Sequence, residues 1–245
     1  MDTTTYVALS RQLVLQRQLD VTANNLANMD TPGFKLESLM VQTDPENLPT
    51  PKGSGGPSVV NFVLDGGVAR DFSAGPVKIT DAPLDLAIKG QGFFTINTPA
   101  GPRYTRDGRF SLDANGQIVT SSGLPVQGEG GPITIDPKLG QVHIAADGTI
   151  SQNAQVVGKL SLVNFASLSG LSKQGDGLYN NVSNVAPQAS TATMLQGAIE
   201  SSNVEPMTQM TQLIKVNNAY AMVSQMLVNV SDLSKAAVDR LGRIS

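Results

Sequence analysis

The C-terminal region repeats apolar residues at alternating steps of three and four, and this restricts the fold more than any other feature of the sequence. Only Ser234 interrupts the series. Such spacing keeps the apolar side chains on one face of a helix and is typical of helix-on-helix packing. The series consists of Leu213, Val216, Tyr220, Val223, Leu227, Val230, Ala237 and Leu241. We therefore expect a long C-terminal helix, with Pro206 in its first turn, whose seam another helix must cover.

The N-terminus carries a matching stripe and predicts the partner helix. Val7, Val14 and Val21 fall seven residues apart, flanked by Leu15, Leu19, Leu26 and Met29. The helix should run from about Thr4 to Asn28, because Pro32 disfavours helical geometry before it and Gly33 permits a turn. We expect the two ends of the chain to pair as coiled-coil helices, residues 1–30 with residues 203–245.

The sequence pattern in the middle of the chain predicts β-strands. Short apolar runs end at Asp-Gly or Asn-Gly pairs, which favour tight hairpin turns. The clearest expected strands are 84–88, 93–97, 109–112, 118–120, 142–144 and 156–165. No helical pattern separates them, so the sheet should be antiparallel, in a small barrel or sandwich. The fold class is thus α+β: a β-rich outer domain over 59–193, bracketed by the helices through an extended connection at 31–58 and a return connection at 194–202.

Composition excludes several classes of function. Charged residues make up only 15% of 245 residues and the net charge is −3, which does not fit a nucleic-acid-binding surface. The apolar runs are too short to cross a bilayer, and the first residues lack the pattern of a secretory signal. Cysteine is absent. We expect no direct membrane insertion.

Catalytic chemistry finds little support in the residues. His143 is the one histidine, and we interpret it as an exposed strand residue, so no metal or cofactor site is expected. Ser111, Asp113 and Asn115 faintly imitate a calcium loop but fit a hairpin turn better. A rival hypothesis is a secreted β-rich carbohydrate-binding module or hydrolase. Its best carboxylate pair would be Asp81 and Asp85.

Three asparagines near the end of the first helix allow two interpretations. Asn24, Asn25 and Asn28 are poor residues for a helix interior. Their amides could cap the end of the helix, or they could bond across helices and fix the register, as a polar residue in an apolar seam can. Both interpretations remain open at this point.

Three segments, in order along the whole chain, resemble the bacterial flagellar rod and hook family. The first is Ala23-Asn24-Asn25-Leu26-Ala27-Asn28 leading to Gly33-Phe34-Lys35. The second is Leu84 to Phe94, continued by Tyr104-Thr105-Arg106-Asp107-Gly108-Arg109-Phe110. The third is Ile199-Glu200-Ser201-Ser202-Asn203-Val204. One departure concerns a charged cluster that family members carry in the last helix, because here Asn217 and Asn218 precede Tyr220 and Ala221 follows it.

This resemblance implies a structural subunit of the basal-body rod, not an enzyme. The chain's length and its opening residues 6–12 resemble a proximal rod protein, with a distal rod protein as the alternative. The terminal helices would line the inner tube of an axial shaft that transmits torque and surrounds the export channel. Implied partners are copies of the chain, other rod proteins and the flagellar export apparatus, at a location in the basal body where the rod crosses the periplasm.

The residues expected to carry this function are packing residues. Free terminal helices with uncovered seams would be disordered before assembly, because their order depends on burial of the seams. The expected assembly interface comprises Val14, Val21, Asn24, Asn25, Leu26, Asn28, Leu213, Val216, Tyr220, Val223, Leu227 and Val230.

Overall fold

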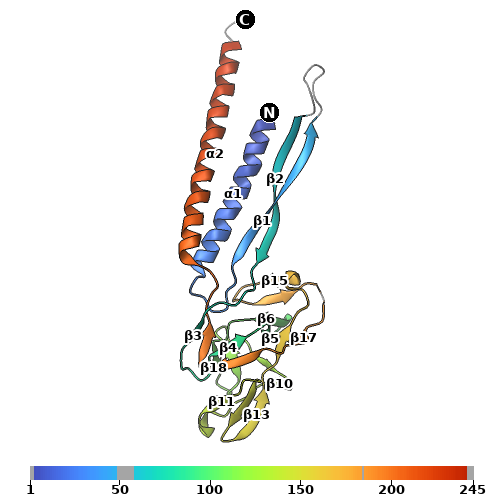
Figure 1. The fold of residues 1–245 in the computed structure, drawn as a ribbon, viewed down its shortest axis with the longest axis vertical. Helices are drawn as coiled ribbons and strands as arrows, with labels where there is room; N and C mark the ends of the chain where they lie inside the picture. The colour runs from blue at the N-terminus through green and yellow to red at the C-terminus, as the bar shows by residue number, and fades with distance from the viewer. Residues whose placement is uncertain (1–2, 49–57, 184, 242–245) are drawn as a thin grey trace. The chain divides into compact units, whose positions relative to one another are not determined.

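The chain folds into two compact units, which a computed structural model describes over residues 3–48, 58–183 and 185–241. The helical unit comprises Met1–Ala27, Glu37–Asp71 and Glu205–Ser245. The β-unit comprises Asn28–Leu36 and Phe72–Val204. Two terminal helices therefore bracket a β-rich middle, as the sequence predicts (Figure 1).

The helical unit pairs two helices with a long β-hairpin. Helix α1 spans Thr3–Ala27 and α2 spans Pro206–Leu241, so Pro206 begins the second helix as expected. Strands β1 (Glu37–Leu48) and β2 (Ser58–Arg70) form an antiparallel ladder with an irregularity between Leu39 and Val41. Helix α1 contacts both α2 and the hairpin, as Figure 1 shows.

The hairpin replaces the extended connection that the sequence suggested for 31–58. Residues 37–48 and 58–70 satisfy each other's backbone hydrogen bonds, and residues 49–57 of the expected connection lie outside the described part. The Asp, Pro and Asn residues near 44–47 favoured a loop, but cross-strand pairing overrides that local preference. The stretch therefore belongs to the helical unit.

The far boundary of the β-unit also differs from the expected one. The expected return connection, 194–202, contains most of strand β18 (Thr193–Gln196) and all of β19 (Ala198–Glu200). These strands pair with β4 (Leu86–Lys89) and β3 (Val77–Ile79). The β-unit thus needs a segment just before α2 to complete two of its sheets.

Antiparallel pairing holds for every ladder among the described strands, as predicted. The largest sheet has the order β15-β16-β6-β5-β14-β17, and β11-β12-β13 form a second one. The expected strand 156–165 is divided between β13 and β14, in different sheets. The remaining bounds are β5 Phe93–Thr98, β6 Gly101–Thr105, β7 Phe110–Leu112, β8 Ile118–Thr120, β9 Gln127–Gly128, β10 Gly131–Pro132, β11 Val142–Ile144, β12 Thr149–Gln152, β13 Gln155–Lys159, β14 Leu162–Asn164, β15 Leu171–Lys173, β16 Tyr179–Asn181 and β17 Gln188–Ala189.

Two apolar clusters hold the β-unit together. The larger is mostly aliphatic and includes Phe94, Ile96, Val126 and Ile150, all fully buried. The smaller is aromatic and joins Phe93, Tyr104, Phe165 and Tyr179, with Leu171. Burial raises the pKa of the Tyr104 phenol.

Carboxylates shape the hairpin turns of the β-unit. Asp113 Oδ1 accepts hydrogen bonds from the backbone N–H groups of Asn115 and Gln117, so the calcium-like stretch is a turn, as interpreted from the sequence. Asp147 acts similarly on Thr149, and hydrogen bonds from the Thr149 backbone and side chain lower the pKa of the Asp147 carboxyl.

Candidate functional site

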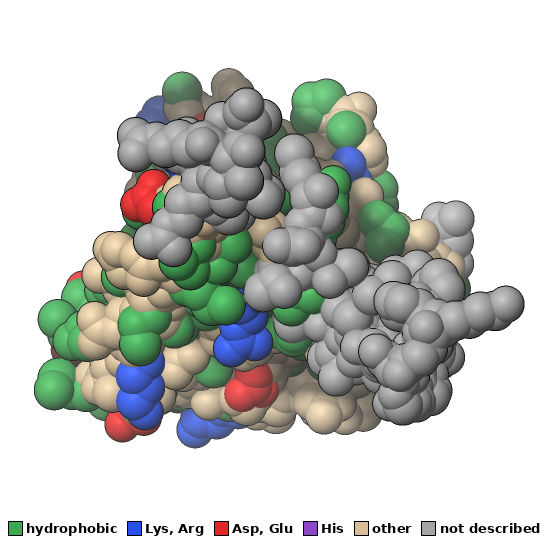
Figure 2. All heavy atoms as spheres, turned by 90° about the horizontal axis from the view of Figure 1, so that it is seen from above, with side chains coloured by type: hydrophobic (Ala, Val, Ile, Leu, Met, Phe, Trp, Pro, Cys, Tyr) green, Lys and Arg blue, Asp and Glu red, His purple; other side chains and the backbone are tan. Residues whose placement is uncertain are grey.

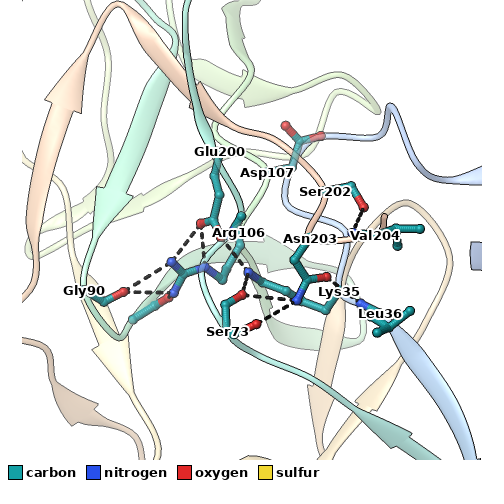
Figure 3. A network of polar contacts seen from close by, with 12 residues as sticks. Lys35, Leu36, Ser73, Gly90, Arg106, Asp107, Glu200, Ser202, Asn203 and Val204 are labelled. Atoms are coloured by element: carbon teal, nitrogen blue, oxygen red, sulfur yellow. Dashed lines mark hydrogen bonds and ion pairs between the residues drawn. The ribbon is translucent and has the colours of Figure 1, made fainter. Parts of the chain in front are cut away.

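A buried cluster of charges joins three distant segments of the β-unit. Glu200 Oε1 lies 2.5 Å from Lys35 Nζ, and Glu200 Oε2 lies 2.7 Å from Arg106 Nη2 and 2.8 Å from Arg106 Nε. All three side chains are at least nine-tenths buried. Figure 3 shows the two cations on either side of the carboxylate. We call Lys35, Arg106 and Glu200 the charged joint.

The backbone around the charged joint leaves room only for glycine at two positions. Gly33 has φ +68, and a Cβ there would lie 2.5 Å from the Arg106 carbonyl carbon. Its N–H donates to the Glu200 carbonyl over 2.8 Å. A Cβ on Gly108 would lie 1.7 Å from the Leu86 carbonyl oxygen. Close backbone approach therefore brings the three segments together.

Hydrogen bonds of the charged joint are directed to the protein itself. Arg106 Nη1 donates to the carbonyls of Gly90 and Gly92, and Nη2 donates to Gly90. Lys35 Nζ also donates to the Ser73 carbonyl over 2.6 Å. The N–H groups of the Arg106 guanidinium thus donate to backbone carbonyls and to Glu200. This pattern of hydrogen bonds indicates a structural joint and not a ligand site.

Asn203 extends the joint toward the end of the β-unit. Its Oδ1 accepts from the Leu36 N–H over 2.7 Å, and its Nδ2 donates to the backbone and hydroxyl oxygens of Ser73 (Figure 3). Leu36, Ser73 and Asn203 all lie within two residues of a boundary of the β-unit. One amide therefore ties together three of the places where the chain enters or leaves this unit.

Sequence pattern does not predict the charged joint, although each of its residues lies in a segment that carries the family resemblance. Lys35 follows Gly33-Phe34, Arg106 precedes Asp107-Gly108, and Glu200 follows Ile199. The sequence therefore marks the three residues of the charged joint only as members of three separate short motifs. Nothing in their spacing showed that they meet in space.

The catalytic candidates from the sequence lie on different segments of the β-unit. His143 is exposed on β11 between Val142 and the buried Ile144, as interpreted. It lines a cavity of about 580 Å³ together with Asp81, whose φ is +58. The backbone of Asp85 pairs with Arg109. Among described residues no group of three His, Cys, Asp or Glu side chains could hold a metal ion.

In the helical unit, most of the expected interface residues lie on the inner faces of the two helices. Val14, Val21 and Val216 are buried. The half-buried members are Leu26, Asn28, Leu213, Tyr220, Val223, Leu227 and Val230, of which Asn28 belongs to the β-unit. Gln12 on α1 donates to the hydroxyl of Tyr220 on α2 over 3.1 Å. The seam therefore joins α1 to α2 within one chain, and its role between subunits stays a prediction.

The asparagines near the end of α1 divide between the two interpretations. Asn25 is buried, donates to the Glu37 carbonyl and to Gln209 Oε1, and accepts from the Glu37 N–H. It therefore links α1 to β1 and α2, as the cross-element interpretation predicts. Asn28 accepts from the Thr31 N–H and hydroxyl and so caps the turn after the helix. Asn24 is exposed.

A second set of apolar residues on both helices stays exposed and was not identified from the sequence. Ile214 and Met222 on α2 are 61% and 67% exposed, and Leu13 on α1 is 60% exposed. The full set is Tyr6, Leu9 and Leu13 on α1 and Met207, Met210, Ile214, Met222, Met226, Val228 and Leu233 on α2. The steps from Met207 to Met210 and Ile214 again alternate three and four. We call this set the exposed apolar face.

Hydrophobic side chains reach the surface in the view of Figure 2, among few and scattered charged ones. None of the described helices is long and apolar enough to span a bilayer. Ten large apolar side chains of the exposed apolar face are each at least 46% exposed, and exposed apolar faces of this kind mark interaction sites.

Comparisons with known proteins agree with these features of the chain. Residues 6–35 match the family model "Flagella basal body rod protein", residues 87–152 match "Flagellar hook protein FlgE/F/G D1 domain", and residues 195–240 match "Flagellar basal body rod FlgEFG protein C-terminal". The charged joint takes Lys35, Arg106 and Glu200 from these three matches in turn.

Full-length relatives carry names from the same family. The flagellar basal-body rod protein FlgF of Caulobacter vibrioides is 49% identical over all of both chains, and that of Mesorhizobium japonicum is 36% identical over 99% of each. The rod protein FlgG of C. vibrioides is 35% identical over 94% of this chain and 95% of its own. The chain therefore belongs to the flagellar basal-body rod family.

Proposed function

We propose that the chain is a structural subunit of the proximal rod, the shaft that transmits torque through the flagellar basal body and surrounds the export channel. Greater identity to a FlgF than to a FlgG of the same species supports the proximal over the distal position. One structural observation carries the proposed mode of assembly. Both helices of a chain pair through one seam while a second apolar face on each stays exposed.

Two apolar faces on each helix are consistent with assembly through a repeated contact between two different surfaces of identical subunits. The seam formed by residues such as Val14 and Val216 is filled within the chain, so the exposed apolar face remains for neighbouring subunits. A contact between different surfaces of identical subunits extends into a helical filament when it does not close into a ring. The helices would then pack as coiled coils between subunits as well as within them.

Burial of the exposed apolar face supplies the driving force for such assembly. Full burial of one Leu, Ile or Met side chain is worth about 1.5–3 kcal/mol. The face holds ten large apolar residues, so its burial contributes a free energy of the same order as the cost of joining two subunits, about 4–15 kcal/mol. Polar residues such as Asn217 and Asn218 are exposed on α2 between them and would fix the register.

In the proposed arrangement the helical unit and the β-unit have different roles. The helical unit forms the inner wall of the tube, and the charged joint holds the β-unit together as one body. Partners are copies of the chain, other rod proteins and the flagellar export apparatus. The place of action is the rod where it crosses the periplasm. The names of the relatives support this location.

Replacing Ile214 by Asp tests the proposal. Because Ile214 is exposed, a charge there should leave the isolated chain folded but stop incorporation into basal bodies in a bacterium whose own copy is deleted. Ile79→Asp is a matched control, since Ile79 is 72% exposed on strand β3 of the β-unit. Leu227→Asp, in the seam, should stop incorporation and also loosen the helix pair.

Motility and the protein content of purified basal bodies give the readout. Normal incorporation of Ile214→Asp would contradict assembly through the exposed apolar face. If Ile79→Asp were excluded just as strongly, contacts of the β-unit would dominate instead. The position of the chain along intact basal bodies separates a proximal from a distal rod subunit.

A further inference from the structure

Methionine is concentrated on the exposed side of α2. The chain has eight methionines, and four of them are Met207, Met210, Met222 and Met226. All four are between 47% and 72% exposed on this one helix. We call these four the methionine face.

The seam side of the same helix contains no methionine. Its residues are Leu213, Val216, Tyr220, Val223, Leu227 and Val230, all buried or half-buried. The two sides of α2 therefore differ in chemistry as well as in exposure. Aliphatic side chains resist mild oxidants, whereas the thioether of methionine does not.

We propose that the methionine face is a reversible oxidation site, at which peroxide converts the free subunit into a form that cannot assemble. The proposal rests on assembly through the exposed apolar face of α2. Subunits already in a rod would be protected because neighbours cover these side chains, so oxidation would act on subunits before they assemble.

The reaction needs only hydrogen peroxide or an organic peroxide as the oxidant. The thioether sulfur attacks one oxygen of hydrogen peroxide, or the terminal oxygen of an organic hydroperoxide. The O–O bond breaks, an S–O bond forms, and the proton on the transferred oxygen passes to the leaving hydroxide or alkoxide. Sulfur loses two electrons, and hydrogen peroxide is reduced to water. The product, methionine sulfoxide, is polar and is returned to methionine by methionine sulfoxide reductases.

Oxidation on this face would change assembly without unfolding the chain. A sulfoxide in an apolar contact must lose its hydration, so a face that carries several is no longer suited to burial. The pairing of α1 with α2 uses Val14, Val21 and the methionine-free seam, and it is left as it was. Methionine also packs well against unlike surfaces, which suits a face that meets both copies and other rod proteins.

The chain contains its own controls for the chemistry. Met194 is 5% exposed in the core of the β-unit and should react slowest. Met29 and Met40 are exposed but lie outside α2, so they report on oxidation that does not touch the methionine face. Peptide mapping by mass spectrometry after a timed peroxide treatment of the purified full chain measures each rate.

We expect the four positions of the methionine face to be oxidised roughly tenfold or more faster than Met194, because susceptibility follows exposure. Far-ultraviolet circular dichroism should not change. Equal rates at Met194 and the face, or loss of helix on oxidation, would overturn the proposed site irrespective of how the subunit assembles.

Two quadruple variants test the consequence in cells whose own copy is deleted. Replacing all four methionines by Leu keeps the face apolar and removes the thioethers, so incorporation and motility should persist during sublethal peroxide treatment that lowers both in the unaltered strain. Replacing all four by Gln imitates the polar sulfoxide and should prevent incorporation without any oxidant.

The two variants separate the proposed switch from the proposed function. If the Gln variant assembles normally, the face is not an assembly surface and both proposals fail. If the Gln variant is excluded but the Leu variant is as sensitive to peroxide as the unaltered chain, assembly through the face stands and the oxidation site is refuted.

Discussion

Replacing Glu200 by Gln removes the one carboxylate between Lys35 and Arg106 while keeping the shape of the side chain. Glu200 accepts hydrogen bonds from Lys35, Arg106 and the Gly75 N–H, at 2.5 to 3.0 Å. Breaking a buried ion pair by removing one partner costs about 3–5 kcal/mol. Small domains have about 5–15 kcal/mol of stability in total, so the β-unit should lose about a fifth or more of its free energy of unfolding.

Glu129→Gln is the matched control. Glu129 pairs with Lys159 at 2.8 Å, but the side chain of Glu129 is 58% exposed and that of Lys159 is 40% exposed. Water screens such a pair, so no measurable loss of stability is expected. The two variants therefore compare the same Glu→Gln substitution at a buried and at a solvent-exposed ion pair.

Hydrogen exchange across a urea titration measures the free energy of unfolding of the β-unit separately from the helices. Peptides that cover β5 and β6 report on the sheet next to Arg106. A midpoint for Glu200→Gln that matches the Glu129→Gln control would refute the view that the charged joint holds the β-unit together.

Three further substitutions follow from individual contacts. Ala154→Gly should stabilise the β12–β13 turn by about 1 kcal/mol, because Ala154 has φ +63, and an unchanged melting temperature would contradict this. Gly108→Ala should cost more than about 2 kcal/mol through its clash with a backbone oxygen, whereas Gly130→Ala meets nothing within 4 Å and should be neutral in urea unfolding. Asn25→Ala should weaken the helical unit by about 2 kcal/mol, seen as lost helical circular dichroism on heating, while exposed Asn24→Ala should not; equal effects would refute the proposed bridging role.

Periodicity was sufficient to predict both helices and the strands β4, β5, β7, β8 and β11. The α1 stripe ends at Pro32-Gly33 and the α2 seam begins after Pro206, and local rules determine both limits. Strands such as 118–120 and 142–144 were predicted because each is a short apolar run close to an Asn-Gly or Asp-Gly pair. Such features depend on neighbours in sequence, which one chain displays.

Contacts between distant segments were not predictable in the same way. The β1–β2 ladder pairs residues 37–48 with residues 58–70, and the charged joint brings together residues 35, 106 and 200. A lone Lys, Arg or Glu is usually a surface residue, so its burial depends on a partner that sequence pattern does not reveal. The exposed apolar face was not predicted, because the seam already explains the periodicity of apolar residues along α2.

Labelling of a single cysteine at position 214 tests the central claim most directly, because the chain has no cysteine of its own. Ile214→Cys keeps the position apolar, and maleimide should label it promptly in the purified subunit. In basal bodies that contain the variant, the account predicts protection until the rods are denatured. Equal labelling rates in the free subunit and in intact rods would show that no neighbour covers this face of α2, and assembly through it would be contradicted.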